Sequence, residues 1–223
     1  METINKINYD KAFQLFVSKD ELRPDMLTPF KQDNKYFATD AMAIIFIPIE
    51  EVELNYPERS RPQCSAVLPK EDVMNIKINI SDIEEKLIPE MIEEFTEEEK
   101  ETDCAECSGT GEVEFEYNTH IETYYLEADC PLCKGAGSIT KTDAKPTGKT
   151  IPNPSQKYKM QGTGFHYWQL KRLVDACKIL DVETITKTNG TERHGNLFKC
   201  GKATIMIMPI ISDGVPDTEY III

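Results

Sequence analysis

The sequence predicts an α+β domain that is built from two similar halves and is split by a cysteine-rich insertion. Three observations lead to this prediction: a repeated hairpin-like segment near each end of the chain, an amphipathic helix before each copy, and two CxxC pairs between the copies. The 223 residues are enough for one elaborated domain or two small ones, and 40% hydrophobic with 29% charged residues is typical of a globular protein.

The repeated segments, Asn34–Ile49 and Gly195–Ile210, align at a constant offset of 161 residues, which places Phe37 on Phe198. Each has a short strand ending in Phe, a polar turn, and a β-branched run that stops at proline, which cannot donate to a sheet ladder. Any two isoleucine-rich hairpins resemble each other, but the matching phenylalanine and proline favour a true duplication.

An amphipathic helix precedes each segment. The first has an apolar face whose pattern ends near Arg23–Pro24, where the residue before proline disfavours helix. Its apolar face consists of Ala12, Phe13, Phe16 and Val17. The apolar stripe of the second consists of Leu170, Leu173, Val174, Cys177 and Leu180.

The segment Val73–Ile80 alternates in the manner of a half-buried strand. The proline and acids before it are also suited to the first turn of a helix, so strand and helix both remain open.

The formal net charge of -14 argues against nucleic-acid binding, which depends on lysine and arginine, but the acid is local. Ser81–Asp103 holds eleven acids and two lysines, whereas Thr140–Gly164 holds five lysines and one aspartate and is rich in proline and glycine. We interpret both runs as solvated segments, and the second as a linker.

The strongest chemical signal is a pair of CxxC motifs, Cys104 with Cys107 and Cys130 with Cys133. Seven cysteines without an export signal favour metal binding or free thiols over a disulfide framework. Four thiolates are the ligand set of a closed structural zinc site, so we expect one zinc ion. The glycines after each pair permit the positive φ of such turns, and the chain between the pairs is a plausible hairpin.

Redox-active CxxC pairs are the alternative interpretation, although they do not need the twinned GxG that follows each pair. Cys64, Cys177 and Cys200 stand apart, and we expect them to be buried free thiols.

The unit Cys104–Gly137 resembles the cysteine-rich domain of DnaJ co-chaperones, whose repeat is CxxCxGxG. That domain has four repeats and two zinc ions, so the two repeats here imply one zinc. Nothing else in the chain suggests a J-domain, and the co-chaperone activity is not carried over.

The two ends of the chain resemble the bacterial sliding clamp, the beta subunit of DNA polymerase III. The resemblance lies in Phe16–Leu27 followed by Ala38-Thr39-Asp40, and in Phe165–Cys177 followed by a strand that ends Met208-Pro209. It implies a DNA-clamp-like duplicated β-α-β-β-β domain, split here by a zinc-binding β-hairpin insertion. A clamp subunit has three such domains and two subunits close a ring, whereas this chain is long enough for one.

The resemblance also implies two candidate sites. The helices that would face DNA carry modest positive charge, and the Met-Pro strand would border a groove for partner peptides, with a plain core strand as the alternative. The possible DNA-facing residues are Lys11, Lys19, Arg23, Lys171, Arg172 and Lys178. The possible groove residues are Met208, Pro209 and Ile210. In clamps a turn with His and Arg usually follows Ala-Thr-Asp, whereas Ala41-Met42 follows here.

We divide the chain at these features. Residues 1–59 and 160–223 form the two halves of the clamp-like domain, 60–103 a connecting strand or helix with the acidic segment, 104–137 the zinc-binding insertion and 138–159 the linker.

The sequence offers no matched acid, base and nucleophile, so we expect a protein that is not an enzyme. We expect a binding module of DNA replication or repair, encoded by a phage or mobile element, that docks protein partners and binds DNA weakly as a monomer. The alternative is a zinc-stabilised chaperone-like adaptor for exposed apolar polypeptide. The lack of a signal peptide and of any apolar run near the roughly 18 residues of a membrane span predicts a cytoplasmic protein without a membrane partner. Its oligomeric state stays open.

Overall fold

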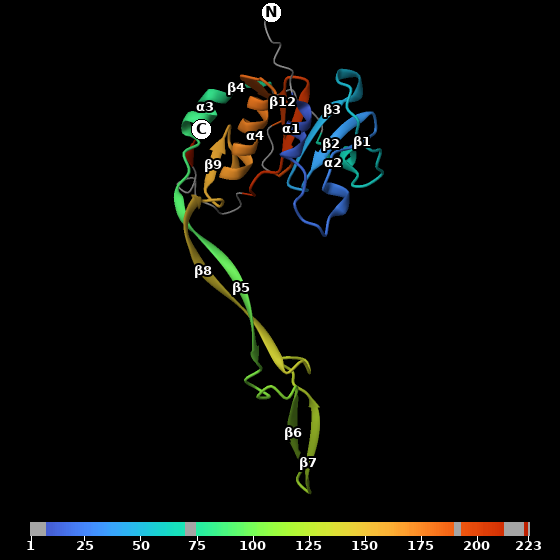
Figure 1. The fold of residues 1–223 in the computed structure, drawn as a ribbon, viewed down its shortest axis with the longest axis vertical. Helices are drawn as coiled ribbons and strands as arrows, with labels where there is room; N and C mark the ends of the chain where they lie inside the picture. Colours follow the sequence, from blue (N-terminus) through green and yellow to red (C-terminus); the bar gives the residue numbers. More distant parts are fainter. Residues whose placement is uncertain (1–7, 70–74, 190–192, 212–220, 223) are drawn as a thin grey trace, which may run out of the picture. The chain divides into compact units, whose positions relative to one another are not determined.

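The computed structural model describes residues 8–69, 75–189, 193–211 and 221–222. The fold is mixed α+β with mostly strands, and the chain divides into two compact units (Figure 1). Met1–Glu90 together with Pro152–Ile223 form what we call the sheet unit, and Met91–Ile151 form the ribbon unit. No helix in these described ranges is long and apolar enough to cross a membrane.

The two ends of the chain meet at the centre of the sheet unit. There, β3 (Ala43–Pro48) pairs antiparallel with β13 (Ala203–Ile207). Over the described residues the sheet has seven strands in the order β1-β2-β3-β13-β12-β11-β4. The other strands are β1 (Phe30–Gln32), β2 (Lys35–Thr39), β4 (Ile76–Asn79), β11 (Thr184–Lys187) and β12 (Asn196–Cys200).

Three helices cover one face of this sheet: α1 (Tyr9–Gln14), α3 (Ile80–Lys86) and α4 (Tyr167–Ile179). Helix α4 contacts both α1 and α3 (Figure 1). The main core lies between these helices and the sheet, and the expected apolar stripes of α1 and α4 are buried in it. A smaller core on the opposite face includes Cys64 of α2 (Cys64–Val67).

The first helix is shorter than the sequence predicts, because it ends at Gln14 and not near Arg23–Pro24. The hydroxyl of Ser18 accepts from the amide of Asp20 at 3.0 Å, and the Asp20 carboxylate accepts from the amide of Leu22 at 3.0 Å. Such local side-chain bonds favour a turn over a continued helix. Short 3₁₀ turns follow at Pro24–Met26 and Ile49–Glu51.

A second, three-stranded sheet leads into α4. Its order is β10-β9-β14, formed by β9 (Lys157–Met160), β10 (Thr163–His166) and β14 (Ile221–Ile222). The order β10, α4, β11, β12, β13 therefore gives the second half a β-α-β-β-β sequence. The described part of the first half has the order α1, β1, β2, β3.

The two hairpins of the main sheet correspond at an offset of 160 residues, and the expected offset of 161 is wrong. Phe37 lies in the smaller core and Phe198 in the main core, on opposite faces of the sheet. Ile45 and Ile205 are 160 positions apart, pair directly and share one face of the sheet. Because side chains alternate between faces along a strand, residues related by an odd offset such as 161 lie on opposite faces. At 160, the pair Phe37↔Phe46 matches the pair formed by the residues 160 positions later, Leu197↔Met206, and the Ile45↔Ile205 pair lies at the centre of the correspondence.

Most of the two charged segments that we interpreted as solvated lies in the two largely exposed strands of one ribbon. β5 (Met91–Asp103) pairs with β8 (Ser138–Pro152). Lys145 lies 2.5 Å from Glu98, and Lys100 lies 3.5 Å from Asp143. Residues 138–159 are therefore mostly strand and not linker, because acids on one strand attract lysines on the other.

The segment Val73–Ile80 is described only from residue 75. Ile76–Asn79 is strand β4, and Ile80 begins α3. The alternation predicted at Val73 and Met74 lies outside the described residues.

A lysine is buried at the edge of the main core. Lys187 has no exposed surface, and its ammonium donates to the hydroxyl of Thr163 at 2.8 Å. Burial lowers the pKa of Lys187 to about 8 from its usual value near 10.5. The folded state therefore loses this proton at a lower pH than the unfolded chain.

We expect Lys187→Met to stabilise the protein by about 1 to 2 kcal/mol at pH 7, since it removes the cost of burying a cation and loses one hydrogen bond. The advantage is present in full below pH 8 and shrinks as pH rises toward 10.5, because the wild type gains stability in that window. Chemical denaturation from pH 7 to 10 measures it.

Lys77→Met is the matched control, because Lys77 is an exposed lysine on the adjacent strand β4. It should change stability by less than about 0.5 kcal/mol at every pH. A destabilisation by Lys187→Met that does not vary with pH would contradict the prediction.

Candidate metal centre

The four predicted cysteine ligands lie in two knuckles of the ribbon unit. Cys104 and Cys107 follow β5, and Cys130 and Cys133 lie between β7 (Thr123–Asp129) and β8. Strands β6 (Glu112–Asn118) and β7 form an antiparallel hairpin between the knuckles. This hairpin returns the chain to its starting point, so that the second knuckle faces the first.

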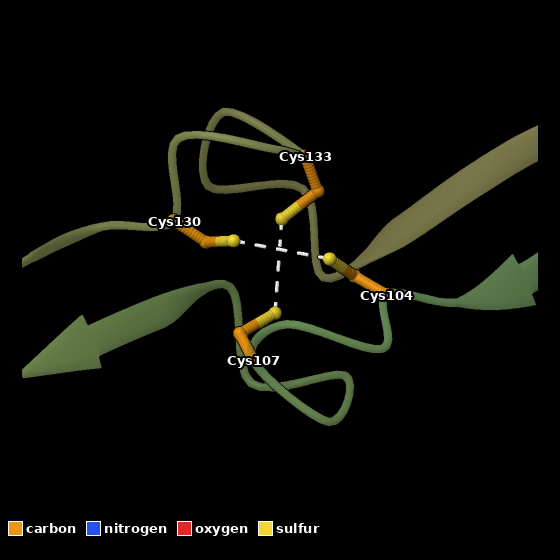
Figure 2. A group of neighbouring side chains, drawn as sticks. All are labelled: Cys104, Cys107, Cys130 and Cys133. Atoms are coloured by element: carbon orange, nitrogen blue, oxygen red, sulfur yellow. Dashed lines mark hydrogen bonds between the residues drawn. The ribbon is translucent and has the colours of Figure 1, made fainter.

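The four sulfur atoms converge on one point (Figure 2). The Sγ atoms of Cys104 and Cys130 are 3.8 Å apart, as are those of Cys107 and Cys133, and all four lie within 4.8 Å of one another. Three of these cysteines are buried and Cys133 is half-buried. The structure thus brings together all four residues that the spacing singled out.

The last glycine of each knuckle links the two knuckles. Gly111 donates its amide to Cys107 Sγ at 3.3 Å and accepts from the amide of Cys130 at 2.7 Å. Gly137 repeats this arrangement, with its amide 3.3 Å from Cys133 Sγ and its carbonyl 2.8 Å from the amide of Cys104. The last glycine of each repeat therefore both orients a sulfur atom, through its amide, and joins the two turns, through its carbonyl.

No side chain fits at these two glycines. A Cβ at Gly111 would lie 2.5 Å from the carbonyl oxygen of Gly135, and a Cβ at Gly137 would lie 2.5 Å from that of Gly109. Both also have positive φ, of 84° and 76°. Close backbone approach, in addition to φ, explains the second glycine of each CxxCxGxG repeat.

The electrostatics of the cluster favour a thiolate. Burial alone would raise the pKa of Cys107, but hydrogen bonds from the amides of Gly111 and Gly109 and from the neighbouring thiols outweigh it and lower the pKa to about 7. A thiolate is the form that binds a metal ion.

The donor set and its spacing fit a tetrahedral metal ion and exclude disulfides in this arrangement. Zinc–sulfur bonds of about 2.3 Å in a tetrahedron place the sulfurs about 3.8 Å apart, whereas a disulfide needs about 2.05 Å. Four thiolates leave no position for water or substrate, so the centre can organise the fold but cannot activate a reactant.

The three remaining cysteines are free thiols in the core, as expected. Burial raises the pKa of Cys64 to about 12. Cys177 of α4 and Cys200 of β12 lie with their sulfurs 2.9 Å apart, and this contact together with burial raises the pKa of Cys177. Cys64 and Cys177 are therefore protonated thiols near neutral pH.

The cations expected to face DNA are mostly paired with acids. Arg172 donates to Asp40 at 2.6 Å and lies over the rings of Phe16 and Trp168, 5.5 and 5.0 Å from their centroids. The other three pairs are Arg23 with Asp20, Lys171 with Asp175, and Lys178 with Glu84. Lys11 and Lys19 are exposed.

The residues of the expected peptide groove are half-buried and belong to the backbone network of the sheet unit. The carbonyl of Met208 accepts from Gln169 of α4 at 2.7 Å, and its amide donates to Met42 at 3.0 Å. Ile210 bridges to Gly164 of β10. Pro209 lies between them and is half-buried.

Sequence reasoning missed the role of Asp40. One carboxylate oxygen of Asp40 accepts from the amides of Met42 and Ala43, both at 2.9 Å, and the other accepts from Arg172. Asp40 therefore shapes the β2–β3 turn and ties it to α4. An acid that directly follows a strand and precedes a turn was the available signal.

Solved structures that resemble this chain include bacterial sliding clamps. The Helicobacter pylori beta clamp bound to a DNA ligase peptide has a TM-score of 0.46 and 11% identity, covering 92% of this chain and 62% of that one. The Bartonella birtlesii DnaN sliding clamp bound to griselimycin has a TM-score of 0.44 and 10% identity, and the match covers 91% of this chain and 64% of that one. The Streptococcus pneumoniae DNA polymerase III beta chain has a TM-score of 0.41 and 13% identity, and the match covers 92% of this chain and 63% of that one. The chain thus spans a little over three fifths of these structures. No protein-family model and no curated protein matches the sequence.

We expect Gly111→Ala to weaken metal binding at least about tenfold, because its methyl group must displace the backbone that joins the knuckles. Competition with a chromophoric chelator, applied to the full chain, measures the change.

Gly148→Ala is the matched control. Gly148 also has a positive φ, of 75°, but a Cβ there meets nothing within 4 Å. We expect it to cost about 1 kcal/mol of local strain and to leave metal affinity unchanged. Equal loss of metal in the two variants would mean that φ alone, and not the close approach, explains the glycine.

Proposed function

We propose that this chain is a non-catalytic binding module of sliding-clamp-like fold that serves DNA replication or repair by docking protein partners. In this proposal the sheet unit is one duplicated clamp-like domain, the ribbon unit is an insertion held by one zinc ion, and DNA contact is secondary. The cytoplasmic location expected from the sequence is part of the proposal.

The paired charges on the helices are the observation that carries the preference for protein over DNA. Phosphate binding depends on lysine and arginine that are free to replace counterions. Arg172 is 19% exposed and engaged by Asp40, and Lys171 and Lys178 each pair with an acid. The free energy lost when such an ion pair breaks offsets much of the free energy gained when the cation contacts phosphate.

The register of the hairpins supports the duplicated domain. Four cross-strand pairs of the first hairpin, from Tyr36↔Ile47 to Thr39↔Ile44, correspond to four pairs of the second when each residue is moved by 160 positions. Helices α1 and α4 then lie on the same face of the two halves. This arrangement agrees with the β-α-β-β-β duplication that the resemblance to the clamp family implies.

The chaperone-like adaptor is the second candidate, and the exposed hairpin of the ribbon unit favours it. Phe115, Tyr117, Tyr124 and Leu126 are between 47% and 69% exposed, which is unusual for large apolar side chains on one short hairpin. An adaptor of this kind would bind unfolded polypeptide irrespective of its charge and of added salt.

The proposal predicts one zinc ion per chain. Native mass spectrometry of protein purified without chelator should give a mass one zinc above that of the apo chain, and Cys104→Ser combined with Cys130→Ser should abolish it. Cys64→Ala, in the other unit, should keep the metal. A stoichiometry near zero, or two ions per chain, contradicts the ligand assignment.

The proposal also predicts that the protein is a monomer or dimer that binds duplex DNA weakly, with a Kd above about 1 μM near physiological salt. A clamp holds DNA by closing a ring, and single domains would need about six copies in cyclic symmetry to do so. Light scattering and fluorescence anisotropy with a labelled duplex test both points. A ring-sized assembly, or sub-micromolar affinity from a monomer, would overturn the proposal.

A further inference from the structure

The hairpin β6–β7 has one apolar face and one acidic face. The cross-strand register places Val113 opposite Ala128, Phe115 opposite Leu126 and Tyr117 opposite Tyr124, so six apolar or aromatic side chains share one face. Four of them are exposed by about half or more. Val113, beside the knuckles, packs against the cysteine cluster. The four exposed side chains belong to no core cluster of the described residues, although an antiparallel pair commonly buries one face.

The opposite face brings like charges together. Glu112 lies directly across from Asp129, and Glu114 lies directly across from Glu127. Like charges in direct cross-strand pairs are destabilising. There is no lysine or arginine between Cys104 and Cys133 to offset them, although that stretch contains seven acids.

The hairpin also has two free edges. Its sheet consists of β6 and β7 only within the described part of the chain, so the outer backbone amides and carbonyls of both strands lack sheet partners there. Such an edge is a template for an added strand. A single added strand could therefore cover the apolar face, neutralise the acids and pair with the free edge.

We propose that a free edge of β6–β7 binds an extended segment of a partner protein in which apolar residues alternate with lysine or arginine. Because side chains of a strand alternate between faces, its apolar residues extend the aromatic face while its cations lie beside the paired acids on the other face. This inference rests on the proposed role in protein docking and names the chemistry of the partner.

The charges disfavour the other occupants. A second copy of the hairpin at the same edge would extend the row of paired acids, and nucleic acid would meet seven acids and no lysine or arginine in the stretch Cys104–Cys133. An alternating basic strand is the occupant that satisfies the edge, the apolar face and the acids at once.

The test uses the full, metal-loaded chain and a fluorescent nonapeptide that alternates lysine and valine. We expect saturable binding by anisotropy that weakens as salt is raised to about 0.15 M and beyond. A peptide alternating glutamate and valine, and a peptide of the same lysine and valine content arranged in two blocks, should bind at least about tenfold more weakly. Equal binding of either comparison peptide would overturn the proposal.

A matched pair of variants tests the location. Glu114→Gln with Glu127→Gln removes one pair of acids that lie opposite each other. The double variant should bind the lysine–valine peptide about fivefold more weakly, with unchanged metal content and an equal or higher Tm. Glu97→Gln with Glu99→Gln makes the same change of charge on β5, and it should leave the affinity within about twofold. Equal weakening by the two double variants would show that only net charge matters and would overturn the site.

The aromatic face has its own variant. Phe115→Thr keeps strand propensity, and the variant should bind the lysine–valine peptide more weakly while it retains its metal. Failure of peptide binding by protein that holds one zinc ion overturns this inference alone, whereas absence of the metal overturns the proposed function.

Discussion

The antiparallel pairing of β3 with β13 is the interaction on which the sheet unit depends. It joins residues about 160 positions apart, and every other strand of the seven-stranded sheet extends outward from it. The hairpins on either side are local and need only short turns. Their apolar faces, however, are buried only when Ile45 meets Ile205 and when α1 and α4 cover the joint. Arg172 reinforces the same joint, because it links α4 to the β2–β3 turn through Asp40.

The long ribbon unit between the two paired strands costs this pairing little, because the chain segments that lead into it and out of it are held together. The amide of Asn153 donates to the carbonyl of Glu90 at 2.7 Å, and the side chain of Asn153 donates to the Glu90 carboxylate at 3.1 Å. To the sheet unit, the whole ribbon unit therefore behaves like a short closed loop. Loop-closure entropy also rises only slowly with loop length. Charge pairing between β5 and β8 and the contacts of the cysteine cluster support the ribbon unit, since two-stranded sheets with both faces in water are marginal alone.

Sequence patterns predicted the features that depend on local chemistry. The CxxC spacing singled out the four cysteines that converge, and the apolar stripe at Leu170, Leu173 and Val174 is the buried face of α4. The offset of 161 was misleading because identical letters, such as Phe37 and Phe198, were matched without regard to the face of the sheet. Only the cross-strand register separates an odd offset from an even one.

The features that the sequence did not predict are pairings across long separations. The acids of β5 and the lysines of β8 each look like a solvated run when considered alone, and their attraction is visible only once the strands lie together. The same holds for Arg172, whose charge suggests a contact with phosphate but whose partner is Asp40, 132 residues away. The cations on α4 are thus mostly paired with acids of the same unit. In the hairpin of the ribbon unit, by contrast, acids lie opposite acids, four large apolar side chains are exposed, and neither edge pairs with another strand of the described residues. We therefore expect recognition by this chain at the hairpin of the ribbon unit more than at the helices of the sheet unit.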